Sequence, residues 1–148
     1  MFEQVLPSSI DNTYRGHKLA LWLLGLLALM RFVIGLRSIF DGYAVMTAAD
    51  GIPLGTYPPP AAQTMIALWA LLGLTHVIIG VLCVIVLLRY RSMIPFMFSL
   101  LLLQHLSGRL ILQFLPIVRT GTPPAPVINL TFLALMIAGL GLSLWKRR

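Results

Sequence analysis

The sequence predicts an all-α integral membrane protein, an antiparallel bundle of four transmembrane helices. The 148-residue chain is 59% hydrophobic and only 10% charged, and its mean hydropathy is +0.93. A soluble domain of this size needs far more polar residues to cover its surface. Four apolar runs each reach the length of about 20 residues that a helix needs to cross a bilayer. Little sequence remains outside these runs, so we expect one membrane domain over residues 1–148.

The four expected spans follow one another with short connections. They cover about residues 19–40, 61–88, 93–115 and 127–145. The loop 41–60 is rich in glycine and proline, which favours turns and extended structure over helix. The short connection 89–92 predicts that the second and third spans form an antiparallel hairpin. Pro116 is expected to end the third span, and three prolines at positions 123, 124 and 126 precede the fourth.

Basic residues lie mostly on one side of the predicted membrane. They are Arg15, Lys18, Arg89, Arg91 and Lys146–Arg148. The loop 41–60 contains no lysine or arginine, and the loop before the fourth span contains only Arg119. This asymmetry predicts a multi-pass protein of the bacterial inner (plasma) membrane with both termini in the cytoplasm. It also accounts for the net charge of +7 without a nucleic-acid partner.

Small residues at helical spacing predict the faces on which the spans touch. Lipid offers no hydrophobic drive for helix association, so close packing at small residues supplies much of it. The predicted contact stripes are Ala28, Arg31, Gly35 and Ser38 in the first span, Trp69, Gly73, His76, Gly80 and Cys83 in the second, and Thr131, Ala134, Ala138 and Gly141 in the fourth. Cys83 is the only cysteine, which excludes an intrachain disulfide, and we expect it to pack as a small hydrophobic residue.

Polar side chains of the spans gather at one depth. Arg31, His76 and His105 lie on three different spans, each about 20 Å along a helix from the basic residues at the cytoplasmic side. Arg109 lies one turn beyond His105, and Gln104 directly precedes His105. An ionised arginine at mid-bilayer costs about 2.5–3.5 kcal/mol on insertion scales, and no acidic residue lies within the four runs. These five residues are therefore the predicted ligand-binding set.

The preferred hypothesis is a pocket for a lipophilic or anionic ligand such as a quinone. Arginine and histidine can hydrogen-bond the carbonyl oxygens of a quinone and stabilise its reduced, negatively charged forms. Trp69 and Phe114 are expected to contact the ring and the tail. The protein would act as a subunit or accessory of a membrane redox complex, with membrane lipid and a redox subunit as partners and a homodimer as one assembly.

Two other functions remain open. In the first, His76 and His105 ligate haem b as paired imidazoles, and Arg109 pairs with a propionate. In the second, the basic layer of a non-catalytic assembly or scaffold protein docks an acidic partner helix. No nucleophile–base pair, metal-ligand cluster or phosphate loop is visible, which argues against an enzyme that acts on its own. A proton antiporter is disfavoured because the spans lack a carboxylate.

A purely structural account also remains open. Arg37 lies four residues before Asp41, so we expect an i,i+4 ion pair at the outer boundary. Arg31 and Arg109 would then bond backbone carbonyls, or reach Asp41 and Asp50 in a folded-back loop.

Three segments give the chain a resemblance to a known group. They are Arg31-Phe-Val-Ile-Gly-Leu, Ala70-Leu-Leu-Gly-Leu-Thr-His-Val-Ile-Ile-Gly and Leu103-Gln-His-Leu-Ser-Gly-Arg109. With its length, its four spans and its glycine-rich second span, the chain resembles the small four-helix DoxX-like membrane proteins. The resemblance implies an association with quinol oxidation or redox-linked membrane complexes, and it identifies no catalytic residue.

Overall fold

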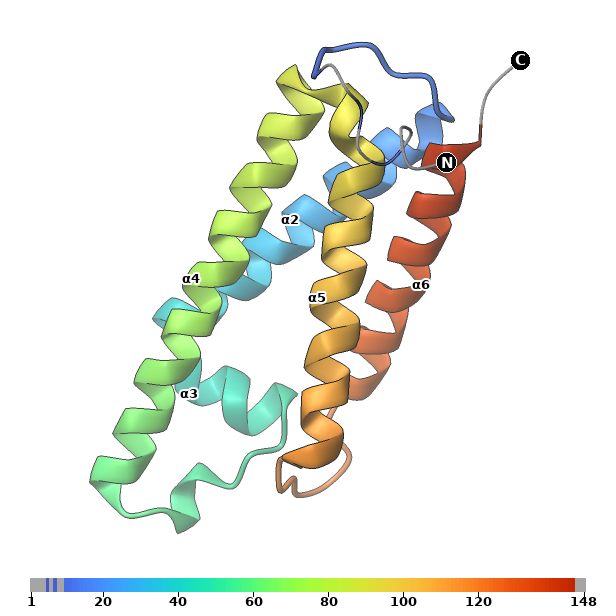
Figure 1. Cartoon of the computed structure of the whole chain (residues 1–148). Helices are drawn as coiled ribbons and strands as arrows, with labels where there is room; N and C mark the ends of the chain where they lie inside the picture. The colour runs from blue at the N-terminus through green and yellow to red at the C-terminus, as the bar shows by residue number, and fades with distance from the viewer. Residues whose placement is uncertain (1–4, 6, 8–9, 146–148) are drawn as a thin grey trace.

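Four long helices make up most of the structure (Figure 1). The computed structural model describes residues 5, 7 and 10–145, and within them it contains helices and no strand. The long helices are α2 (Lys18–Phe40), α4 (Pro59–Arg89), α5 (Ile94–Phe114) and α6 (Ala125–Leu144). Each is long and apolar enough to cross a membrane. The predicted all-α fold and its four spans are confirmed, and every helix end lies within two residues of its predicted position.

Prolines set several helix ends. Pro59 occupies the first turn of α4. A backbone N–H in this turn has no acceptor within the helix, so the N–H that proline lacks costs no hydrogen bond. Pro124 is the N-cap of α6. At the other end of the preceding loop, α5 stops at Phe114, two residues before Pro116, because proline restricts the residue that precedes it to extended conformations.

Helices α2 and α4 form the most extensive helix pair. They approach most closely at Gly35 and Gly73, where a Cβ atom added to either glycine would lie 2.7 Å from the carbonyl oxygen of the other. Two turns farther along α4, the ring of Phe32 lies 3.2 Å from the position of a Cβ at Gly80. All four stripe residues of the first span are buried, as are Gly73, Gly80 and Cys83 of the second. The small residues therefore identify this interface correctly.

The packed face of α6 differs from the predicted one. The residues Thr131, Ala134, Ala138 and Gly141 are exposed, and the buried ones are Ala125, Phe132, Met136, Gly139 and Ser143. The fully buried ring of Phe98 in α5 presses on Gly139, where it leaves no room for a Cβ atom. Two large side chains, Phe132 and Met136, fill the space beside it in the main core. Shape complementarity to α5 thus selects a face one position away from the small-residue stripe.

The hairpin of α4 and α5 is open rather than closely paired. A short 3-10 turn at Arg91–Met93 joins the two helices, which then diverge and make few contacts with each other (Figure 1). The first loop fills part of the space at their far ends. Its short helix α3 (Gly42–Ala44) continues into a π-helix, η1 (Val45–Ala49), and a 3-10 turn, η2 (Leu54–Thr56), follows.

The expectation that the first loop is not helical is therefore wrong for residues 42–49. The segment 43–49 contains neither glycine nor proline, and burial of Met46 stabilises its helical turn. Met46 packs in a small core with Ile52, Leu54, Met65, Ile66, Trp69 and Ile117. This core joins the first loop to α4 and to Ile117 in the loop that follows α5.

The two loops at this end are also tied together by hydrogen bonds. The backbone N–H of Thr120 donates to the carbonyl oxygen of Gly51 over 2.7 Å, and its hydroxyl donates to the same oxygen over 3.2 Å. Gly51 has a φ of +71°, a conformation that glycine adopts without steric cost. A Cβ at Gly51 would lie 2.8 Å from the carbonyl oxygen of Thr120.

Residues 10–17, called the strap below, cross the opposite end of the bundle. The strap begins at the α4–α5 connection, where the backbone N–H of Asp11 donates to Ser92 Oγ over 3.1 Å and Ser92 Oγ donates to the carbonyl oxygen of Asp11 over 2.9 Å. It ends at α6, where the backbone N–H of His17 donates to the carbonyl oxygen of Leu142 over 3.0 Å. The strap therefore connects three of the four long helices before α2 begins.

Candidate functional site

Arg31 lies in the interior, at the centre of the predicted basic layer. Only 6% of its surface is exposed, and it forms no ion pair with any described residue. Its guanidinium group lies within electrostatic range of His76, His105 and the buried thiol of Cys83. The structure thus places Arg31 within electrostatic range of each of the two histidines that the sequence predicts at its depth.

The loop carboxylates do not neutralise this arginine. Asp41 pairs instead with Arg37, whose Nη2 lies 3.2 Å from Asp41 Oδ2, so the predicted i,i+4 ion pair is confirmed. Asp50 is partly buried beside Arg119, and the pKa of its carboxyl is raised by burial although the positive charge of Arg119 opposes the shift. Within the described chain, Arg31 therefore pairs with neither Asp41 nor Asp50. The alternative in which Arg31 reaches these carboxylates in a folded-back loop is wrong.

The two histidines present unused ring nitrogens. His76 Nδ1 lies 2.9 Å from the carbonyl oxygen of Leu72, which makes Nδ1 the donor in a neutral ring and leaves Nε2 as an acceptor. His105 Nε2 and Gln104 Oε1 are buried and have no hydrogen-bond partner among the described residues. A buried polar atom without a partner costs about 1–3 kcal/mol, so a group that satisfied these atoms would stabilise the bundle.

Arg109 occupies the exposed edge of the predicted set. It lies within electrostatic range of His105, but its side chain is exposed on α5. Trp69 belongs to the small core around Met46, and Phe114 is 77% exposed at the end of α5. That Trp69 and Phe114 contact the ring and the tail of a ligand therefore stays a prediction.

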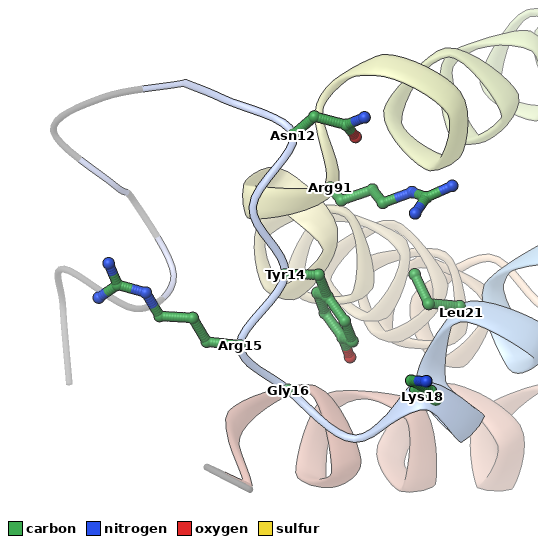
Figure 2. Close-up of a pocket in the computed structure, with 7 residues that line it drawn as sticks. All are labelled: Asn12, Tyr14, Arg15, Gly16, Lys18, Leu21 and Arg91. Carbon is green, nitrogen blue, oxygen red and sulfur yellow. The ribbon is translucent and has the colours of Figure 1, made fainter.

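A cavity of about 620 Å³ lies elsewhere, between the strap, α2 and the α4–α5 connection (Figure 2). It is lined by Asn12, Tyr14, Arg15, Gly16, Lys18, Leu21 and Arg91, and by none of the five predicted ligand residues. The Tyr14 hydroxyl donates to the carbonyl oxygen of His17 over 3.1 Å, and burial raises the pKa of this phenol to about 12. From the sequence, Arg15, Lys18 and Arg91 indicate only the orientation of the protein in the membrane.

Comparisons with known proteins add no relative. No protein-family model matches the chain, and no curated protein or solved structure is significantly similar to it. The DoxX-like resemblance thus has no family match behind it. Among the described residues, no group of three or more histidine, cysteine, aspartate or glutamate side chains is arranged to hold a metal ion.

Proposed function

We propose that this four-span membrane protein binds a lipophilic ligand with carbonyl or anionic oxygens, such as a quinone, beside Arg31, His76 and His105. The observation that supports the proposal is the burial of Arg31 without a carboxylate partner in the described chain. A cation in this position needs an anion, a dipole or water, and the energetic cost of leaving it alone is high. A bound oxygen would supply that partner.

The three basic side chains offer complementary hydrogen bonds. Arg31 has only donors, so it suits a carbonyl oxygen or a reduced oxyanion. His76 presents Nε2 as an acceptor, which suits the hydroxyl of a quinol. His105 and Gln104 bring buried atoms without partners, and Arg109 adds a positive charge at the exposed edge. Together they would favour both the oxidised and the reduced form of a quinone, as a subunit or accessory of a redox complex requires.

Replacement of Arg31 tests this function. Decylubiquinone, added to the purified protein in mild detergent, serves as the probe, and its binding is followed by quenching of tryptophan fluorescence. We expect Arg31→Leu to weaken binding about ten- to a hundredfold, because a hydrogen bond to a charged group contributes about 1.5–3 kcal/mol. The free energy of unfolding should stay the same or rise, since leucine removes an unpaired buried cation.

Arg37→Leu is the matched control. It removes one positive charge from the same helix, but Arg37 is exposed and pairs with Asp41, so quinone binding should be unchanged. Unchanged binding in Arg31→Leu would refute the proposed site. A large loss of stability without a selective loss of binding would favour a structural function for Arg31.

The free ring nitrogens keep haem b ligation by His76 and His105 as a second candidate. A helical histidine whose Nδ1 donates to a backbone carbonyl has its Nε2 oriented for a metal. A reduced-minus-oxidised visible spectrum of the purified protein distinguishes the two functions. Sharp haem bands that disappear in His76→Ala or His105→Ala would establish a cytochrome, and a featureless spectrum would exclude haem in that preparation.

Exposure of Arg109 within a membrane span supports an assembly function in addition. A lipid-facing cation is satisfied by an acidic helix of a partner subunit or by a second copy of the chain. The orientation we propose has both ends of the chain in the cytoplasm of a bacterial cell. Its support is the cluster of Arg15, Lys18, Arg89 and Arg91 at the strap end, whereas Lys146–Arg148 lie outside the described residues.

A further inference from the structure

The strap cavity combines a concave shape with an excess of positive charge. Its volume of about 620 Å³ lies within the range of about 300–1,000 Å³ that is usual for ligand sites. Figure 2 shows Tyr14 between Arg91 on one side and Lys18 on the other, while Arg15 extends away from them on the far side of the strap. Three cations and no acidic residue line the cavity.

Nearby groups leave these cations available. Arg91 Nε donates to the carbonyl oxygen of Leu87 over 2.9 Å, which holds the side chain in place without using its terminal nitrogens. The neighbouring carboxylate of Asp11 accepts hydrogen bonds from the hydroxyl and the backbone N–H of Thr13, over 2.6 and 3.0 Å. These bonds, with a smaller contribution from the positive charge of Arg15, hold the pKa of Asp11 below its usual value, so Asp11 is satisfied as an anion without Lys18 or Arg91.

The position of the cavity joins a polar surface to the membrane. Lys18 is the first residue of α2, and Leu21, one turn into the apolar span, supplies the hydrophobic wall. Asn12 adds a polar amide at the opposite side (Figure 2). Basic pockets at the ends of transmembrane helices are suited to the headgroups of anionic lipids, because the phosphate meets the cations while the acyl chains stay in the bilayer.

We propose that the strap cavity binds a phosphate-bearing anion, with the headgroup of an anionic phospholipid as the source that its hydrophobic wall favours. Lys18 and Arg91 contact the phosphate from two sides. Asn12 provides a further hydrogen bond, and Arg15 strengthens the local positive potential from the rim.

Lipid binding by the full-length protein in mild detergent tests this site. Dioleoylphosphatidylglycerol and dioleoylphosphatidylcholine are compared by native mass spectrometry, with glycerol 1-phosphate as a soluble probe. We expect selective binding of phosphatidylglycerol, weakened about fivefold by Lys18→Gln or by Arg91→Gln, the loss that corresponds to one basic contact near a membrane surface. Two separate variants are used so that the result does not depend on the folding of either one.

Arg89→Gln is the matched control, because Arg89 lies at the same end of the bundle but does not line the cavity. It should bind phosphatidylglycerol as the unchanged protein does. Glycerol 1-phosphate binding as tight as that of the lipid, with the same sensitivity to Lys18→Gln, would support the phosphate site and assign it to a soluble ligand. Equal weakening by Arg89→Gln, or no preference for either phosphate probe over phosphatidylcholine, would overturn the proposal.

Discussion

Substitution of Gly73 should separate the two most closely packed helices. In Gly73→Ala the new methyl group would lie 2.7 Å from the carbonyl oxygen of Gly35 and 2.8 Å from Ser38 Cβ. Ordinary van der Waals contact begins at 3.4 Å, so the backbones must move apart by about 0.7 Å (3.4 − 2.7). Both obstacles are rigidly attached to helix α2, and no side-chain rotation relieves the clash. Overpacking of this kind costs about 1–3 kcal/mol.

Gly108→Ala provides the comparison for this effect. Gly108 also lies in a membrane-spanning helix, but a Cβ there meets no atom within 4 Å. Its replacement should therefore be neutral or stabilise the helix by at most about 1 kcal/mol. Free energies of unfolding are measured by titration with sodium dodecyl sulfate in mixed micelles, with helicity followed by circular dichroism. If Gly73→Ala were as stable as Gly108→Ala, the close crossing of α2 and α4 would be incorrect.

Two further predictions concern the loops at the far end. Gly51→Ala should lower the melting temperature more than Gly121→Ala. Both glycines have a φ near +70°, a conformation that costs an alanine about 1–2 kcal/mol, but only a Cβ at Gly51 meets close neighbours. An equal fall in melting temperature for the two variants would mean that the contact of Gly51 with Thr120 is absent. For Asp50, the raised pKa means that the folded protein favours the protonated carboxyl, so its contribution to stability is complete below the unfolded pKa of about 3.8 and is lost as pH rises through the folded value. Asp50→Asn should accordingly raise the free energy of unfolding at pH 7 and change it little at pH 3, and a pH-independent effect would contradict this assignment.

Hydropathy was sufficient to predict the four spans because a bilayer imposes both length and composition on a helix. It carried less information about which face of a helix is buried, since lipid-facing and core-facing residues are equally apolar. Small residues identified the buried faces of α2 and α4, where two glycines meet. They failed for α6, where the fit of Phe98 against Gly139 decides the packing, and such a fit depends on side chains from a different helix.

The candidate site was predictable in part for a similar reason. Helical rise alone placed Arg31, His76 and His105 at one level, and in the structure Arg31 lies within electrostatic range of both histidines. Exposure of Arg109 was not predictable, because helical rise fixes the depth of a residue and not the direction in which its side chain points. The strap cavity was missed because the residues that line it, such as Tyr14 and Arg91, are far apart in the chain.

The strap also has a consequence for the order in which the protein is assembled. Its bond from His17 to Leu142 joins the start of the first membrane helix to the end of the last, and Gly16 packs directly against the carbonyl oxygen of Ser143. During synthesis the strap emerges before the four long helices, yet its contact with Leu142 forms only after α6 has been made and inserted. Contacts so distant in sequence form slowly, because the intervening chain must first be ordered. We therefore expect the strap to close late in folding, only in a chain whose four long helices are all in place.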